Sequence, residues 1–169
     1  MNIAILGAGS IARNMAKTLR GMKARGQNVE LYAIAARDLA RAQAFKEEEG
    51  FVKAYGSYEE MLSDAAVELV YVATPHSHHA EHVKLCLQYS RPVLCEKAFT
   101  GNARQAREVL ALAREKNVFI TEAIWTRYMP SRTMINDLIT AGEIGQPIRL
   151  TANLGYAIAD KERIFRPEL

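Results

Sequence analysis

The sequence predicts an α/β fold built on a doubly wound parallel sheet. Short apolar runs rich in β-branched residues alternate with stretches of helical periodicity through residues 1–123. The first run, Ile3 to Leu6, ends in the pattern Gly7-x-Gly9-x-x-Ala12, which is typical of a tight turn from a strand into a helix. From residue 124 onward the alternation stops, so a different structural unit is expected there.

The expected elements follow one another in a regular order. A strand is predicted where a short apolar run is bounded by turn residues, and a helix where apolar residues recur every three or four positions. Asp38 is a candidate N-cap, and Ser57 with Glu60 has the form of a capping box. The predicted strands cover residues 2–6, 29–36, 51–55, 67–73, 92–95 and 118–121, and the predicted helices begin near residues 10, 38, 57, 77 and 102.

Each position of the glycine pattern has a physical role. Gly7 permits the tight turn out of the strand, Gly9 lacks the Cβ that would hold a pyrophosphate away from the backbone, and Ala12 lets the helix pack close to the strand. The helix that begins at Ser10 and Ile11 directs unpaired N–H groups and the positive end of its dipole to the same place. In this context the pattern predicts a dinucleotide-binding site of the Rossmann type, and the alternative is a simple tight turn.

The end of the second strand indicates which dinucleotide is bound. An acidic residue there would bind the ribose 2′-hydroxyl of NAD, whereas an arginine suits the 2′-phosphate of NADP. The sequence reads Ala35-Ala36-Arg37, and a guanidinium pairs well with phosphate, so NADP is favoured over NAD. The neighbouring Asp38 is interpreted as a helix cap, and contact with a 2′-hydroxyl is its alternative role.

All four histidines of the chain lie in the segment 76–82, directly after the fourth predicted strand. His78 and His82 could share a helix face as metal ligands, but no carboxylate or cysteine stands at a recognisable ligand spacing, so no metal site is predicted. The favoured interpretation places a histidine of the first helical turn beside the nicotinamide. The other histidines are then expected on a solvated helix face.

The fifth predicted strand ends in Cys95-Glu96-Lys97-Ala98. A Glu-Lys pair is most often an exposed ion pair, but this one follows a parallel strand and is therefore expected to face the crevice shared by the other strand ends. Hydride transfer between nicotinamide and a carbonyl or carbinol carbon requires a proton to move on oxygen. A partly desolvated lysine can supply or polarise that proton, so Lys97 is the predicted catalytic residue.

Composition argues against several other classes of function. The net charge is only +3, and the 22 basic and 19 acidic residues are interspersed, so neither nucleic acid nor a membrane surface is an expected partner. No run approaches the ~18 apolar residues of a membrane span. A strand directly after Met1-Asn2 leaves no room for a signal peptide, so a cytoplasmic location is expected. Cys86 and Cys95 are expected to be reduced core residues.

The pattern changes after Pro130. Residues 134–139 predict a helix, residues 141–147 form a break, and Ile148 to Tyr156 has the alternation of an extended strand. A single strand cannot bury its own apolar face, so the sequence is expected to be part of a longer protein. The predicted organisation has three parts: a dinucleotide-binding domain at 1–123, a connecting helical segment at 124–146, and the first strand of an antiparallel α+β domain at 147–169.

The linked motifs resemble the glucose-fructose oxidoreductase and inositol dehydrogenase family, Gfo/Idh/MocA, of NAD(P)-dependent dehydrogenases. Three motifs stand in that family's order and spacing: Gly7 to Ala12, Ala73-Thr74-Pro75-His76 with His79, and Cys95-Glu96-Lys97. The stretch from Thr121 to Pro130 further resembles the dihydrodiol dehydrogenase (xylose dehydrogenase) branch, which uses NADP. The candidate cofactor-binding residues are therefore Gly7, Gly9, Ser10, Ile11, Ala12, Arg37, Thr74, Pro75, His76, His79, Glu96, Lys97, Trp125 and Arg127.

The sequence departs from the family in two places. The family usually has a proline after the Glu-Lys pair, often with a cis bond that aims the lysine, whereas Ala98 stands here and a cis bond before it costs roughly 3 kcal/mol. The family's second domain, which carries further active-site residues and much of the dimer surface, has no counterpart before Leu169. The resemblance implies that the full-length form is a homo-oligomer, and that this half can bind cofactor without turnover.

Two functions are compatible with these features. The first is an NADP-dependent oxidoreductase that transfers hydride between nicotinamide and a small-molecule sugar or cyclic diol, with Lys97 as proton donor or acceptor. The alternative is a non-catalytic NAD(P)-binding sensor or interaction module, because the same fold can bind NADP without chemistry.

Overall fold

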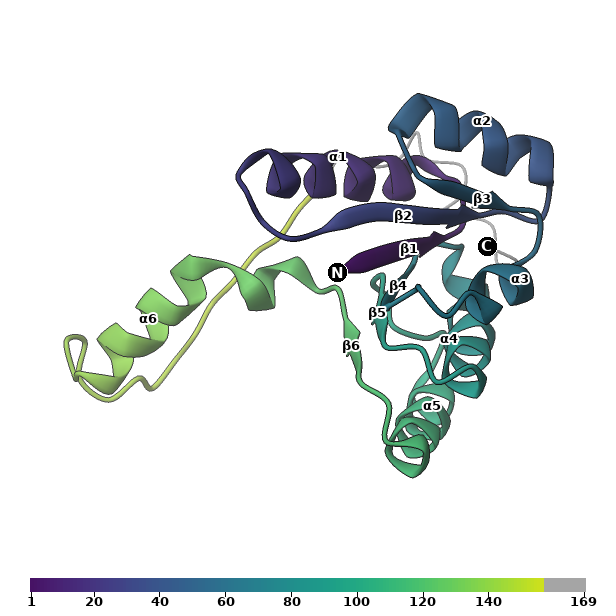
Figure 1. Cartoon of the computed structure of the whole chain (residues 1–169). Helices are drawn as coiled ribbons and strands as arrows, with labels where there is room; N and C mark the ends of the chain where they lie inside the picture. The colour runs from purple at the N-terminus through teal and green to yellow at the C-terminus, as the bar shows by residue number, and fades with distance from the viewer. Residues whose placement is uncertain (157–169) are drawn as a thin grey trace. The chain divides into compact units, whose positions relative to one another are not determined.

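A computed structural model describes residues 1–156 and contains a six-stranded parallel sheet (Figure 1). The strand order is β3-β2-β1-β4-β5-β6, so the direction of winding reverses between β1 and β4. This confirms the predicted doubly wound fold, and a crevice beyond the carboxyl ends of β1 and β4 is where such folds bind ligands. The strands are β1 (Asn2–Leu6), β2 (Glu30–Ala35), β3 (Lys53–Tyr55), β4 (Leu69–Val72), β5 (Val93–Cys95) and β6 (Ile120–Glu122).

Helices connect the strands, and three of them begin at capping residues that the sequence contains. Asp38, Ser57 and Asn102 each accept a hydrogen bond from a backbone N–H in the first turn of the helix that follows, as N-caps do. The helices of the sheet domain are α1 (Ser10–Ala24), α2 (Leu39–Glu49), α3 (Tyr58–Ser63), the 3₁₀ turn η1 (His76–His78), α4 (His79–Gln88) and α5 (Ala103–Lys116).

Alternate residues of each strand supply two apolar layers, one on each face of the sheet. On one face, Ile3 and Ile5 of β1 pack in the same cluster as Leu19 of α1 and Phe45 of α2. On the other face, strand side chains pack with those of α4 and α5, as Figure 1 shows from the positions of these helices. Burial on both faces explains why the strands read as continuous apolar runs.

A polar cluster at Asp64 joins β2 and β3 to the end of α3. Asp64 Oδ2 accepts hydrogen bonds from the phenols of Tyr32 (2.9 Å) and Tyr55 (2.6 Å) and from the ammonium of Lys53 (2.8 Å). These donors, Lys53 first, hold the pKa of the Asp64 carboxyl well below its usual range. The cluster contains none of the predicted site residues.

The chain divides into two compact units, Met1–Ala123 and Ile124–Leu169. The described part of the second unit contains the 3₁₀ turn η2 (Trp125–Tyr128) and α6 (Pro130–Thr140). The strand expected from Ile148 to Tyr156 is not formed, because residues 147–156 have neither helix nor strand structure. A strand requires a hydrogen-bonded neighbour, and within residues 1–156 all strand pairs belong to β1–β6. Residues 157–169 of the predicted third part lie outside the described residues.

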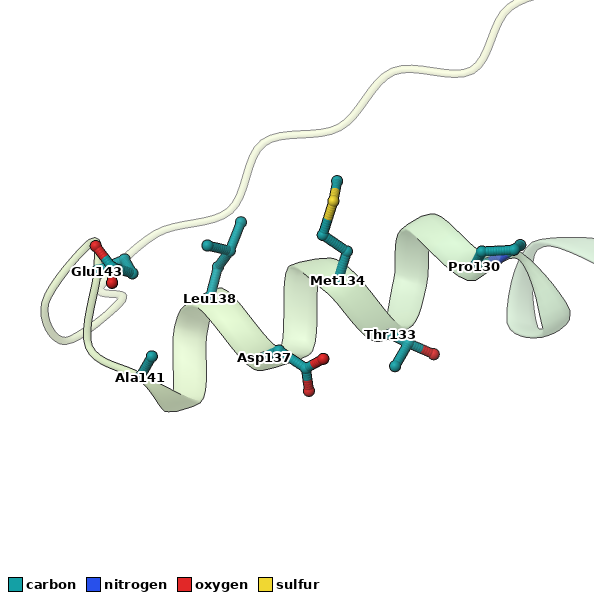
Figure 2. Close-up of a pocket in the computed structure, with 7 residues that line it drawn as sticks. All are labelled: Pro130, Thr133, Met134, Asp137, Leu138, Ala141 and Glu143. Atoms are coloured by element: carbon teal, nitrogen blue, oxygen red, sulfur yellow. The ribbon is translucent and has the colours of Figure 1, made fainter.

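Helix α6 exposes a row of apolar side chains. Figure 2 shows Met134 and Leu138 projecting from the same side of the helix. They line a shallow pocket of about 620 Å³ together with Pro130, Thr133, Asp137, Ala141 and Glu143. No predicted site residue lines this pocket. Across residues 1–156, no helix has the length and apolar character needed to cross a membrane.

Candidate functional site

Four neighbouring strands end on one row of the sheet. In the strand registers, Leu6 of β1 is opposite Ala35 of β2 and Val72 of β4, and Val72 is opposite Cys95 of β5. The backbone ladder continues one residue beyond these ends, with Ala73 N donating to Leu6 O (2.9 Å) and Glu96 N donating to Val72 O (3.0 Å). The loops that carry the predicted site residues of the sheet domain therefore start side by side.

The two glycines in the loop after β1 have different structural roles. Gly7 has a φ of +105°, and a Cβ there would lie 2.9 Å from Thr74 Cγ2 and 3.1 Å from Ala73 O. A Cβ on Gly9 would meet no atom within 4 Å. Gly7 is therefore required by the fold, whereas the space beside Gly9 is open to a ligand.

The start of α1 suits an anion. Gly9 caps the helix without a side-chain hydrogen bond, and the first turn contains no acidic residue. The N–H groups at the start of the helix have no intrahelical acceptor and carry the positive end of the helix dipole. Ser10 and Ile11 are exposed beside this end, while Ala12 is buried against the sheet. The residues present therefore fit the pyrophosphate of a dinucleotide.

Two arginines lie beyond the end of β2. Burial raises the pKa of the Tyr58 phenol, and the nearby guanidinium groups of Arg37 and Arg41 act in the opposite direction. Arg41 also donates to Ala8 O of the glycine loop (2.7 Å). Asp38 Oδ1 accepts from Ala40 N (2.8 Å), which confirms its interpretation as a helix cap. Two cations that both lie near Tyr58 are a suitable environment for a 2′-phosphate.

The sequence reasoning identified Arg37 and missed Arg41. The signal that could have found it is a second arginine four positions after Arg37, in the first turn of the helix that Asp38 caps.

His82, one of the histidines expected on a solvated helix face, is instead half-buried, and His79, a predicted cofactor-binding residue, is buried as well. His79 is fully buried, with Nδ1 2.7 Å from Ala98 O and Nε2 2.9 Å from Thr74 O. His82 is half-buried, with Nδ1 2.9 Å from Thr74 Oγ1, and burial followed by the charge of His78 lowers its pKa to about 4. The first turns of α4 pack against the loop after β4, so these rings find partners in that loop instead of water.

His79 consequently supports the site from inside the fold. By approaching the carbonyls of Thr74 and Ala98, its ring joins the loop after β4 to the turn after β5. His76 is half-buried and packs edge-to-face with His79 at a centroid distance of 5.4 Å, and Pro75 is exposed. Among residues 1–156, no three histidine, cysteine, aspartate or glutamate side chains form a group that could hold a metal ion.

The turn that carries Lys97 is held at three backbone atoms. Lys97 N donates to Glu96 Oε2 (3.0 Å), Ala98 O lies 2.7 Å from His79 Nδ1, and Phe99 N donates to Glu122 Oε1 (2.8 Å). The Lys97–Ala98 peptide bond is cis, although no proline follows Lys97. The three hydrogen-bonding contacts fix the backbone, while the Lys97 side chain is exposed at the carboxyl edge of the sheet.

Glu96 and Lys97 do not form the exposed ion pair that such a dipeptide most often makes. Within the described residues, the lysines that form ion pairs are Lys23, Lys46, Lys53 and Lys84. The Glu96 carboxylate instead accepts from Lys97 N and from the phenol of Tyr71 on β4. The Lys97 amine is therefore available to a ligand.

Tyr71 is a residue of the site that the sequence reasoning missed. It is 3% exposed, and burial together with the neighbouring Glu96 carboxylate raises the pKa of its phenol well above the usual range. The signal for it lies in the register: Tyr71 is opposite Leu94, two residues before Glu96, so Tyr71 and Glu96 share a face of the sheet.

Trp125 and Arg127 belong to the second unit, where they form part of η2 and are both exposed. Their contact with a cofactor remains a prediction of the resemblance.

Comparison with known proteins agrees with this geometry. Residues 1–123 match the Gfo/Idh/MocA family, described as an oxidoreductase family with an NAD-binding Rossmann fold. The chain is 40% identical to the D-xylose 1-dehydrogenase (NADP(+)) of Hypocrea jecorina over 98% of its own length and 47% of that enzyme. It is 39% identical to the trans-1,2-dihydrobenzene-1,2-diol dehydrogenase of Mus musculus, over 92% of the chain and 46% of the relative.

A solved structure shows the same fold. The crystal structure of an NAD-binding oxidoreductase from Klebsiella pneumoniae is similar with a TM-score of 0.81 and 28% identity, over 88% of this chain and 41% of that one. The chain thus spans about half the length of the proteins it matches. The family match confirms the predicted nicotinamide dinucleotide as the cofactor class.

Substituting each loop glycine by alanine separates folding from binding. Gly7→Ala places a Cβ against Thr74 and forces a non-glycine residue into a positive φ, so we expect the free energy of unfolding to fall by about 2 kcal/mol or more. Gly9→Ala meets open space, so stability should change by less than about 1 kcal/mol while affinity for NADPH falls by about tenfold or more. Thermal unfolding and fluorescence titration measure both effects. Unchanged NADPH affinity in Gly9→Ala would place the pyrophosphate elsewhere.

Proposed function

Since the chain belongs to the Gfo/Idh/MocA oxidoreductase family, we propose that it is the cofactor-binding half of an NADP-dependent dehydrogenase acting on a sugar or cyclic diol. The observation that carries the proposal is the exposed Lys97 amine on a fixed turn, at the same edge of the sheet as a loop and helix start that fit a pyrophosphate. In this proposal, the remaining part of the pocket and the surface through which the whole protein forms a homo-oligomer belong to the part of the relatives' length that this chain does not span.

The preference for NADP rests on the residues after β2. Arg37 and Arg41 are the cations near Tyr58, and the carboxylate of Asp38 is engaged by Ala40 N, which leaves it turned toward its own helix. A free 2′-hydroxyl would lack its usual acidic partner there, whereas a 2′-phosphate would meet two guanidinium groups. The relative from Hypocrea jecorina, whose name specifies NADP(+), supports the same choice.

The chemistry proposed for Lys97 is proton transfer on the substrate oxygen. When bound, the dinucleotide supplies the hydride acceptor or donor at its nicotinamide ring. In oxidation, the neutral Lys97 amine accepts the hydroxyl proton of the carbinol, and in reduction its ammonium donates a proton to the carbonyl oxygen. The turn that fixes the Lys97 backbone limits where the amine can reach, which favours a single substrate orientation.

Arginine substitutions test the choice of cofactor. We expect Arg37→Ala and Arg41→Ala each to weaken NADPH binding by about ten- to a hundredfold, because each removes a charged hydrogen-bonding partner of the phosphate. NADH binding should change little, and Arg107→Ala, an exposed arginine on α5, serves as the matched control. Equal affinity for NADPH and NADH that neither substitution changes would contradict the NADP assignment.

A lysine substitution tests the proposed chemistry. In a form of the protein extended to the length of its relatives, Lys97→Ala should lower kcat for sugar or diol oxidation by about 10²- to 10⁴-fold while NADPH affinity stays within about twofold. Lys116→Ala, at the exposed end of α5, is the control. Absorbance at the nicotinamide band follows turnover. If neither the unmodified nor the Lys97→Ala protein turns over any carbonyl sugar or diol, the function is that of a non-catalytic NAD(P)-binding module.

A further inference from the structure

The carboxylate beside Lys97 has both of its oxygens occupied. Glu96 Oε1 accepts the hydrogen bond of the Tyr71 phenol, and Glu96 Oε2 accepts that of Lys97 N at 3.0 Å. Neither bond involves the Lys97 ammonium, although that cation is carried by the adjacent residue. The arrangement therefore separates two opposite charges that the sequence places next to each other.

We propose that Tyr71 is a positioning residue: its phenol directs the Glu96 carboxylate toward the sheet and the backbone, and so keeps the Lys97 amine out of an internal ion pair. An amine held by a carboxylate is stabilised as the ammonium, which makes it a poorer proton acceptor and nucleophile. This inference deepens the proposed function, in which the same amine exchanges a proton with substrate.

The position of Tyr71 suits this role. It lies on β4, which pairs with β1 on one side and β5 on the other, so its backbone is fixed within the sheet. Its ring packs in the apolar cluster that contains Ile3, Ile5 and Leu19. Its phenol stays protonated at working pH because burial disfavours the phenolate, so it remains a donor. A phenylalanine at this position would keep the ring packing and remove only the donor.

Without the phenol, the half-buried Glu96 Oε1 would lose the hydrogen bond that Tyr71 donates to it. An unpaired carboxylate oxygen of this kind turns toward the nearest donor or cation, because leaving it unpaired is costly. The ammonium of Lys97 is the cation on the neighbouring residue. The expected consequence of Tyr71→Phe is therefore an ion pair between Glu96 and Lys97.

Competitive acetylation of amines measures whether this ion pair forms. The experiment uses the 169-residue chain and requires no turnover. The rate at which acetic anhydride labels Lys97, relative to Lys116 in the same chain, is followed by peptide mass spectrometry. We expect Tyr71→Phe to slow the relative labelling of Lys97 by about tenfold, because the ion-paired amine is protonated more of the time. Tyr32→Phe is the matched control, since its phenol also donates to a carboxylate, Asp64, in the cluster away from the site.

Two further variants remove the charge of the Glu96 side chain. In the double variant Tyr71→Phe with Glu96→Gln, the neutral amide cannot pair with the ammonium, so labelling should return to within about twofold of the unmodified chain. Glu96→Gln alone, which keeps the Tyr71 ring and hydroxyl, should also leave the labelling rate of Lys97 within about twofold of that in the unmodified chain. Acceleration in Glu96→Gln would show that Glu96 already pairs with Lys97.

Such acceleration would overturn the inference. An unchanged labelling rate of Lys97 in Tyr71→Phe, or slow labelling of Lys97 in the double variant, would also overturn it. Because labelling does not depend on turnover, these outcomes are separate from a failure of the proposed dehydrogenase activity. In the extended protein the same substitution should lower kcat in parallel with the labelling rate and leave KM for NADPH within about twofold. A fall in NADPH affinity without a change in labelling would assign Tyr71 a purely structural role and overturn the inference.

Discussion

The parallel pairing of β1 with β4 is the constraint on which the site depends. It joins two strands that are more than sixty positions apart in sequence and places Leu6 opposite Val72. Because strand order reverses at this pair, the loops after β1 and β4 diverge to opposite faces and leave a crevice between them. Gly7 is held against Thr74 at this junction, so the turn into α1 and the histidine segment are fixed relative to each other.

The second feature is the way buried side chains hold an exposed turn. His79 from α4, Glu96 from the end of β5 and Glu122 from β6 each contact a backbone atom of the residues 97–99. The backbone of that turn is therefore fixed from several elements, while the Lys97 side chain makes no ion pair within residues 1–156. Fixing the backbone and leaving the Lys97 amine unpaired is the arrangement that the proposed proton transfer requires.

Local features of the site could be predicted from sequence, and those created by packing could not. The Gly7 turn, the start of α1 and the Asp38 cap depend on residues within a few positions of one another, so their chemistry is visible in the sequence. The burial of His79 and the bond between Tyr71 and Glu96 depend on neighbouring strands and helices that only the fold brings together. Arg41 lies between these cases, because its closeness to Arg37 in sequence is local but its bond to Ala8 is not.

In the second unit, too, a local feature could be predicted from sequence and a feature that depends on a neighbouring element could not. The helix α6 was predictable from its apolar spacing, whereas alternation alone does not form a strand at residues 148–156 without a neighbouring strand to pair with.

Convergence of three loops on one dinucleotide is tested most directly by amide hydrogen exchange of the 169-residue chain with and without NADPH. Bound NADPH should slow exchange in residues 7–13, 73–79 and 96–99 together, because these segments follow strands that end on one row of the sheet. Residues 103–116 of α5 should exchange at the same rate in both states. Slowing confined to one of the three segments, or absent from all of them, would contradict a single site formed at the carboxyl edge.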